Sequence, residues 1–521
     1  MSTAENLAAV LVIVAVTVAV GGYGLKARST PDFYVASRTV SPRLNAAAVS
    51  GEYVSAASYL GIAGLLAAHG STMLWYGVGY TAGYLVLLVL VAAPLRRSGA
   101  YTVSDFAEAR LGSPTVRRTA TAFVVLIGWL YQVPQLQGAG LTLHAVLGAP
   151  AWSGAVLVTL VVLASVITGG MRSVTLVQAV QFWVKLTALV VPAVVLVLVW
   201  RGVWQPYGSP SMTPARNART GADQSGGEEL YAVYSLMVAT FLGAMGLPHV
   251  IARYYTNPDG RAARRTTVGV LGLLGVFYLV PEVYGGLGRL YAPAPASAHH
   301  ADTMALLLPG RLVPGAVGQF LTALVVAGAF AAFLSVCSGL ALSVAAVLSQ
   351  DLLGGDVRGF RRASVLAVLV PCVVASFFPE SGVSVAHEVV LIFSVAASTF
   401  CPLLVLGIWW RRLTAAGAVA GMLVGGGSSM LALTLTLLGA GGPGWTGVLL
   451  AQPAAWSAPT AFVTMVGVSL ATPGRVPART SAMLARLHLP EALDAEPAGR
   501  SASAGNRSSR ACARPSRDGH R

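Results

Sequence analysis

The residues Gly51-Glu52-Tyr53-Val54-Ser55-Ala56-Ala57-Ser58 place one carboxylate inside an apolar stretch that covers residues 44–69. About 20 apolar residues suffice for a helix to cross the ~30 Å hydrocarbon core of a bilayer, so the stretch predicts a membrane span. An ionisable group inside such a span is costly and is typical of an ion or substrate path. Glu52 lies roughly 12 Å beyond the predicted helix start, which is too deep for its short side chain to reach water easily. We therefore expect Glu52 to serve coupling or the ion path. The alternative is a structural carboxylate that accepts hydrogen bonds from backbone amides.

The composition of the whole chain agrees with this stretch. Of 521 residues, 55% are hydrophobic and only 10% are charged, and the mean hydropathy is +0.70. Soluble globular proteins carry about 25% charged residues, so the chain is predicted to be an integral membrane protein. The apolar runs predict about 13 spans, at residues 7–25, 44–69, 72–95, 120–147, 152–167, 174–200, 231–250, 268–290, 319–348, 363–378, 387–409, 414–438 and 448–470.

The net charge of +15 is explained by where the basic residues lie. If the N-terminus is outside, most Lys and Arg residues fall in cytoplasmic loops and in the C-terminal tail, as the positive-inside rule requires. We therefore predict a multi-pass protein of the cell membrane with a cytoplasmic C-terminus, and we expect no nucleic-acid partner. The first span has no basic residue before it and is read as a retained helix. The four cysteines have no paired spacing, so neither a disulfide framework nor a metal site is expected.

Two predicted spans contain residues that interrupt helices. In the second span, Gly51, Gly61 and Gly64 bracket the serine-containing stretch; in the seventh, Leu242-Gly243-Ala244-Met245-Gly246-Leu247-Pro248-His249 puts two glycines and a proline near the end. If spans two to six and seven to eleven are inverted repeats, both interruptions fall in the first helix of a repeat. Paired broken helices indicate a midplane binding site, where freed carbonyls can hold a cation and helix N-termini can face an anion. Alternatively, Gly and Pro are simply common in membrane helices.

Several stretches also resemble a known family, the sodium:solute symporters, and within it the cation/acetate symporter (acetate permease) branch. The run from Gly51 to Gly61 is similar to that branch's first core helix. Three further stretches match in order: Gly169-Gly170-Met171 followed by Gln178, Gly246-Leu247-Pro248-His249 followed by Arg253, and residues 331–351. The resemblance implies an all-α fold like that of the leucine transporter, a five-plus-five inverted repeat with extra helices at both ends.

On this basis we divide the chain into six parts. They are residues 1–43 (first transmembrane helix and loop), 44–200 (first inverted repeat), 201–230 (extracellular loop), 231–412 (second inverted repeat), 413–472 (two C-terminal helices) and 473–521 (cytoplasmic tail). The tail is rich in Arg, Ala, Ser, Gly and Pro, which predicts disorder.

The resemblance also implies a sodium site between the second and ninth spans. It places the backbone carbonyls at Gly51 and Val54 and the ninth-span positions at Ala332, Ser335 and Val336. In the sugar-transporting members of the family that the chain resembles, two adjacent hydroxyl residues stand where this chain has Ser335-Val336. One side-chain oxygen is therefore missing, which leaves proton coupling open as an alternative to sodium. An acidic residue that other branches carry after the Gly-Gly motif is replaced here by an amide, Gln178.

Further polar residues are candidates for the site. Ser55, Ser58 and Gln135 are predicted to contact the substrate, although the two serines are equally suited to internal hydrogen bonds. Ser335 has an alternative role as a small hydroxyl residue in helix packing.

Three other polar residues are expected to have structural roles. Lys185 is expected to extend its ammonium toward the cytoplasm. We place His249 and Arg253 at the inner membrane surface.

Taken together, the sequence predicts a secondary active transporter that couples inward movement of a short monocarboxylate, such as acetate, propionate or pyruvate, to sodium or protons. No cofactor is expected beyond a possible sodium ion. A symporter for proline, a sugar or another organic acid is the main alternative. A membrane sensor would need a signalling module after the last span, and an enzyme would need a motif such as HExxH or GxSxG, which the chain lacks.

Overall fold

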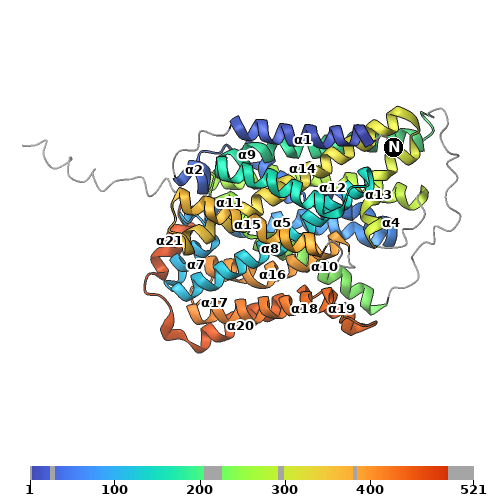
Figure 1. The fold of residues 1–521 in the computed structure, drawn as a ribbon. Helices are drawn as coiled ribbons and strands as arrows, with labels where there is room; N and C mark the ends of the chain where they lie inside the picture. The colour runs from blue at the N-terminus through green and yellow to red at the C-terminus, as the bar shows by residue number, and fades with distance from the viewer. Residues whose placement is uncertain (1–2, 24–29, 205–225, 292–297, 379–383, 491–521) are drawn as a thin grey trace, which may run out of the picture.

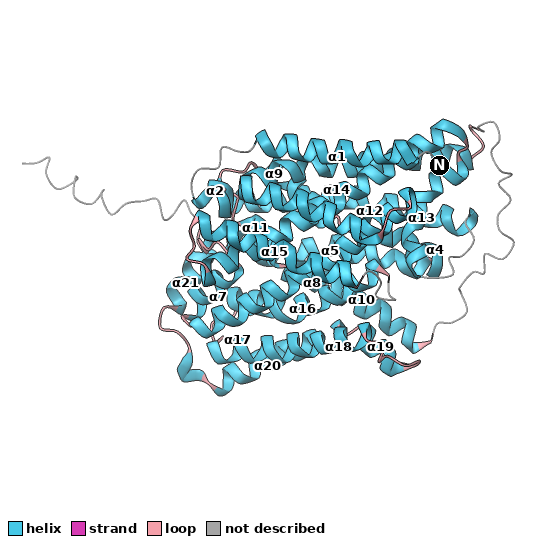
Figure 2. Ribbon diagram, in the orientation of Figure 1, coloured by secondary structure: helices cyan, strands magenta, loops and turns pink. Residues whose placement is uncertain are grey.

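The computed structural model describes residues 3–23, 30–204, 226–291, 298–378 and 384–490. Within these ranges the chain forms helices and connecting loops, and no strand is present (Figure 2). The long helices run roughly parallel to one another in a single bundle (Figure 1).

The helices follow one another in the order α1 to α21, with short 3-10 or π-helical turns between some of them. Their bounds are α1 Thr3–Tyr23, α2 Thr30–Val35, α3 Pro42–Tyr53, α4 Ile62–His69, α5 Trp75–Val86, α6 Ala92–Arg97, α7 Val103–Leu111, α8 Pro114–Leu147, α9 Ala151–Trp200, α10 Gly227–Gly246, α11 Pro248–Tyr254, α12 Gly260–Tyr291, α13 Ala298–Leu312, α14 Gly315–Leu352, α15 Val357–Phe377, α16 Val385–Trp409, α17 Ala415–Gly421, α18 Gly427–Leu437, α19 Trp445–Ala451, α20 Ala454–Ala471 and α21 Thr480–His488.

Among the described residues, 11 helical segments are long and apolar enough to cross a membrane. The difference from the expected number has two sources. The second predicted span is broken into shorter pieces, and the fifth and sixth spans join in the 50-residue helix α9. A straight helix of that length would be about 75 Å long, more than twice the thickness of the hydrocarbon core. The chain bends instead at Gly170, whose φ of 53° and ψ of −153° are not helical.

The second predicted span is interrupted as expected. Helix α3 begins after the Ser41 cap, with Pro42 in its first turn, and ends at Tyr53. Val54 is extended (φ −70°, ψ 94°), and the chain then resumes through a π-helical turn, η2 Ala57–Gly61, into α4. Gly61 permits the close approach of α16, because a Cβ atom there would lie 2.7 Å from the Cβ of Ala386.

The seventh predicted span is interrupted at the expected motif. Helix α10 ends at Gly246, Leu247 is extended (φ −73°, ψ 117°), and Pro248 begins α11. Proline has no N–H to donate to the preceding turn and disfavours a helical conformation in the residue before it, which explains the break. The two broken helices predicted from the sequence are therefore both present.

The centre of the bundle is built on two long helices. Helices α14 and α16 are buried over 83% and 89% of their most apolar windows, against 56% or less for the other spanning segments. Helix α14 packs against α9, α8 and α15, and α16 packs against α10. Helix α1 lies along one edge of the bundle, and α17, α18 and α20 lie along the opposite edge (Figure 1). The helices outside the predicted repeats thus flank the core.

The start of the C-terminal tail differs from the expectation of disorder. Residues Thr480–His488 form α21, whose Leu484 and Leu487 are buried. Arg97 of α6 donates to the carbonyl oxygens of Leu487 and His488, at 3.4 and 3.2 Å. This helix lies at the end of the bundle opposite the N-terminus (Figure 1). Most of the predicted extracellular loop and the rest of the tail, residues 205–225 and 491–521, lie outside the described residues.

Candidate cation and substrate site

A buried ion pair lies at the first helix break. Glu52, in the last turn of α3, accepts a hydrogen bond from Nε of Arg253 on α11. Both side chains are almost completely buried, with 1% of their surface exposed. A buried carboxylate is stable when a cation and further hydrogen bonds compensate its charge, and Arg253 meets this need for Glu52.

Arg253 is not at the inner membrane surface, where the sequence analysis placed it. Its guanidinium donates to four groups in all: besides Glu52, these are Thr175 Oγ1 at 2.7 Å, Met171 Sδ at 3.0 Å and Gln178 Oε1. The three additional partners belong to α9, just after its bend. The planar guanidinium thus ties α11 to α3 and α9 at once.

Glycines create the space that this arrangement needs. A Cβ atom at Gly339 of α14 would lie 2.7 Å from Cγ of Glu52 and still closer to the carboxylate. At Gly51, an added Cβ would lie 3.3 Å from Cβ of Phe182 and would overlap the backbone of Gln178. Because these two positions carry no side chain, α3 can approach α14 and α9 closely enough for Glu52 to be enclosed between them.

The four residues predicted to bind a cation come together. Ser335 Oγ of α14 lies 2.8 Å from the Gly51 carbonyl oxygen and 3.0 Å from the Ala332 carbonyl oxygen. The Val54 carbonyl oxygen lies near them as well, because Lys185 Nζ donates both to this oxygen and to Ser335 Oγ. The family resemblance thus implied a set of oxygen atoms that are adjacent in space.

The position of Lys185 differs most from what the sequence predicted. The Lys185 side chain was expected to reach the cytoplasm, but it is 0% exposed. Its Nζ donates to the carbonyl oxygens of Gly51 and Val54, the latter at 2.8 Å, and to Ser335 Oγ at 2.5 Å. The ammonium of α9 therefore lies among the oxygens predicted to hold a metal cation.

A signal for Lys185 was present in the sequence. The residue lies near the middle of the predicted span 174–200, where the rule applied to Glu52 holds equally for a cation. Arg253 offered a weaker signal, because it follows the Pro248 break by little more than one helical turn.

The three residues predicted to contact substrate lie beside the first break and hydrogen-bond there. Gln135 Oε1 of α8 accepts from the Ala56 amide at 2.9 Å. Ser55 Oγ accepts from the Ser58 amide at 3.4 Å, and Ser58 Oγ lies 2.9 Å from Tyr278 Oη. The hydroxyl groups thus have the internal partners that the alternative interpretation expected, and a substrate role for them stays a prediction.

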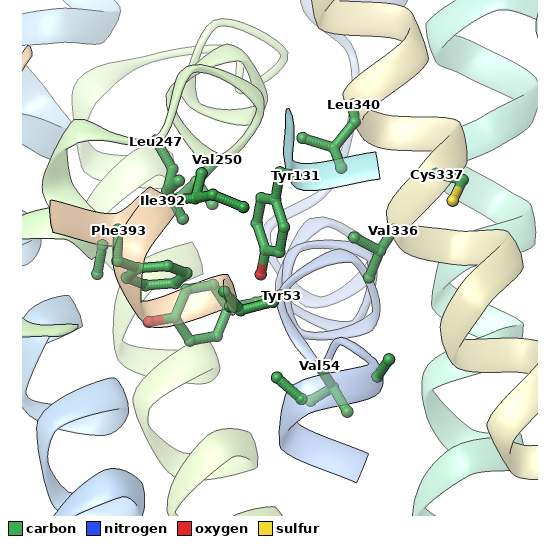
Figure 3. Close-up of a cluster of buried hydrophobic side chains, with 14 of the residues drawn as sticks. Tyr53, Val54, Tyr131, Leu247, Val250, Val336, Cys337, Leu340, Ile392 and Phe393 are labelled. Carbon is green, nitrogen blue, oxygen red and sulfur yellow. The ribbon is translucent and has the colours of Figure 1, made fainter. Parts of the chain in front are cut away.

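Buried polar atoms near this break lack protein partners. They are Nε2 of Gln135 and both ring nitrogens of His249. The His249 ring packs 5.5 Å from the ring of Tyr131, which lies one turn before Gln135 on α8. Tyr131 also packs against Phe393, and Tyr53, Val54 and Val336 line the same cluster (Figure 3). Buried polar groups usually have partners, so these atoms mark a place where a ligand or water can bind.

The other two glutamines around Pro134 do not join Gln135. Gln132 donates to the carbonyl oxygens of Gly128 and Ala367, and Gln137 donates to that of Phe378. Gln137 lines a largely apolar cavity of about 330 Å³ between α8, α15, α16 and α18. None of the predicted site residues lines that cavity.

Comparison with known proteins adds three findings. Residues 33–425 match the model of the sodium:solute symporter family. An "Uncharacterized symporter YwcA" of Bacillus subtilis is 33% identical over 481 residues, covering 87% of this chain and 91% of that protein. A "Monocarboxylic acid transporter" of Corynebacterium glutamicum is 29% identical over 509 residues, covering 88% and 90%.

Among solved structures, a Na⁺-coupled sialic acid symporter in a substrate-bound outward-open state superimposes with a TM-score of 0.65 at 16% identity. The match covers 90% of this chain and 98% of that one. This similarity confirms the predicted all-α, leucine-transporter-like fold.

Proposed function

Because the chain belongs to the sodium:solute symporter family, we propose that it is a cation-coupled symporter that carries a short monocarboxylate, such as acetate, propionate or pyruvate, into the cell. The substrate would bind beside the break after α3, within reach of Gln135, Ser55 and Ser58. The cation would be sodium or a proton.

The charge balance at the break is the observation that carries the proposal. Two basic side chains, Lys185 and Arg253, are buried here, and Glu52 is paired with Arg253. With Lys185 as an ammonium, the cluster has one positive charge more than Glu52 compensates. In a low-dielectric site, an uncompensated charge is costly, and an anionic substrate would compensate it.

The free donors support the same class of substrate. Gln135 Nε2 has two hydrogens and no protein acceptor, and a neutral His249 ring can donate one more. A small carboxylate needs few contacts, and these groups can supply them. The similarity to the Corynebacterium monocarboxylic acid transporter points in the same direction.

Counterflow in proteoliposomes tests the substrate class directly. Vesicles loaded with unlabelled acetate should take up labelled acetate, and external pyruvate or propionate should compete with it more strongly than proline or glucose. If proline or glucose competes better than the monocarboxylates, the proposed substrate is wrong.

A pair of variants tests the location. Gln135→Glu places a negative charge beside the proposed anion and should lower acetate counterflow at least about tenfold, since like charges in contact cost several kcal/mol. Gln137→Glu, on the same helix but half-buried and hydrogen-bonded to the Phe378 carbonyl away from the break, is the matched control and should change uptake by less than about twofold. Equal effects of the two changes would argue against a substrate at Gln135.

A further inference from the structure

The Lys185 ammonium has a complete set of acceptors. An ammonium carries three N–H donors and no acceptor. Nζ of Lys185 has three oxygen partners: the Gly51 carbonyl, the Val54 carbonyl at 2.8 Å and the Ser335 hydroxyl at 2.5 Å. The two carbonyls belong to the broken helix α3 and its C-terminal end, and the hydroxyl belongs to α14. Lys185, which extends from α9, therefore contacts both helices where they cross.

These acceptors are the oxygens that the sequence analysis assigned to a sodium ion. The remaining predicted ligand, the Ala332 carbonyl, accepts from Ser335 Oγ at 3.0 Å. An ion coordinated by these oxygens would need the volume that Nζ of Lys185 occupies. A second cation among the same oxygens would also be repelled by the charge of the ammonium.

The nearby carboxylate of Glu52 does not provide a negative charge for a second cation. Glu52 is paired with Arg253, so its charge is compensated within the protein. The oxygens around Lys185 are neutral, as they would be around a sodium ion, and the positive charge at the crossing is supplied by the chain itself.

We propose that Lys185 is a tethered cation that takes the place of sodium between α3 and α14, so that this protein transports its substrate without binding sodium at this crossing. The inference rests on the proposed function for its transport readout. Of the two coupling cations named above, sodium has no room at this position while the lysine is there. Removal of the side chain should leave a cavity lined by the same oxygens, into which a sodium ion fits.

The test compares two replacements of Lys185 in the full-length protein. Lys185→Ala removes the ammonium and opens the cavity, whereas Lys185→Met removes the charge but keeps most of the volume. Acetate counterflow is measured in sodium chloride and in choline chloride. Wild type should differ by less than about twofold between the two salts; Lys185→Ala should lose at least about tenfold in choline and regain part of it in sodium; Lys185→Met should be inactive in both.

A binding readout keeps the proposal separate from the substrate assignment. The melting temperature of each purified protein is measured in the two salts. Sodium should raise it for Lys185→Ala, by mass action, and leave wild type and Lys185→Met unchanged. Stabilisation of wild type by sodium, or uptake by wild type that depends on sodium, would overturn the proposal. So would a Lys185→Ala protein that is folded but unresponsive to sodium. If acetate is not transported at all, the melting experiment still decides the role of Lys185, and only the substrate class fails.

Discussion

Arg253, on the helix that follows the second break, pairs with Glu52, on the helix that precedes the first, so one buried ion pair joins the two broken helices across 201 residues of sequence. The pair lies beside the Lys185 cluster, because Glu52 follows Gly51 directly. Any movement of one broken helix relative to the other must therefore carry this pair along or separate it.

The first prediction concerns the strength of this pair. Glu52→Gln keeps the size of the side chain but leaves the Arg253 guanidinium without its counter-charge, which should destabilise the protein by about 3–5 kcal/mol. Arg253→Gln should have a similar cost for the complementary reason. Melting temperatures of the two single variants and of the double variant form a cycle, in which the double variant should be less destabilised than the sum of the singles. Strictly additive effects would contradict a direct pair.

The same variant tests the predicted place of Glu52 in the ion path. If Glu52 serves coupling, the Glu52→Gln protein that remains folded should not accumulate substrate against a gradient. Glu52→Asp should retain part of the activity, because it retains the charge. Yield and accumulation are measured in one preparation. A well-folded Glu52→Gln protein with normal accumulation would restrict Glu52 to a structural role.

The second prediction concerns Gly339, which makes room for Glu52. In Gly339→Ala, the new methyl group would overlap the carboxylate of Glu52 and force it away from Arg253. Overpacking of this kind costs about 1–3 kcal/mol. Adding Glu52→Asp, whose side chain is one methylene shorter, should restore part of the lost melting temperature. Gly272→Ala in α12 is the control, since its Cβ would have no atom within 4 Å. Equal melting temperatures for Gly339→Ala and the control would show that the space is not needed.

The breaks could be predicted because they depend on local chemistry, whereas the oxygen cluster was implied by the family resemblance. Pro248 removes a backbone hydrogen-bond donor whatever the neighbours of its helix are. The small and polar residues from Gly51 to Ser58 likewise favour a helix break without reference to neighbouring helices. The depth of Glu52 followed from counting residues along its span. The breaks and the depth of Glu52 need no knowledge of which helices are neighbours.

The partners of the charged side chains could not be predicted in this way. Lys185 reaches the crossing because α9 packs against α3 at Gly51, and that contact depends on how each helix is rotated about its axis. A single sequence does not determine this rotation. The long side chain of Lys185 was therefore expected to extend to the water at the cytoplasmic side. Arg253 was misplaced for the same reason. The ordered helix α21 was missed because the composition of the whole tail concealed the apolar pair Leu484 and Leu487, three residues apart.

The third prediction concerns membrane topology. The positive-inside rule places the C-terminal tail in the cytoplasm, and α21 lies at the end of the bundle opposite the N-terminus (Figure 1). Cys512 is a native probe in the tail, and the three other cysteines, Cys337, Cys372 and Cys401, are buried. A membrane-impermeant maleimide should label the protein only after the cells are permeabilised.

Two variants complete this experiment. Cys512→Ser should abolish the labelling, and Ser211→Cys in the predicted extracellular loop, made on that background, should be labelled in intact cells. Labelling of Cys512 in intact cells would reverse the predicted orientation.

The last prediction concerns Asp302 of α13, a helix that is not among the candidate spans. Asp302 Oδ2 accepts from the Val385 amide at the start of α16, at 3.0 Å, and Oδ1 is buried without a hydrogen-bond partner. Burial raises the pKa of Asp302 from its ordinary value of 3.8 to about 7, and the hydrogen bond from Val385 opposes the rise. The folded protein therefore binds a proton at this carboxyl more tightly than the unfolded chain does. Its contribution to stability is complete below the ordinary value, decreases as the pH rises from about 4 to 7, and is constant above that range.

Asp302→Asn should remove this dependence, because the amide is uncharged at every pH and its oxygen can still accept from Val385. The melting temperature of wild type should fall between about pH 4 and pH 7, and that of Asp302→Asn should fall less, so that the variant is the more stable protein at the upper end. The advantage should shrink as the pH falls and disappear below about pH 4, where the wild-type carboxyl is neutral in both the folded and the unfolded chain. A constant difference between the two proteins across this range would mean that Asp302 does not change its charge while buried, and that its contact with α16 does not respond to pH.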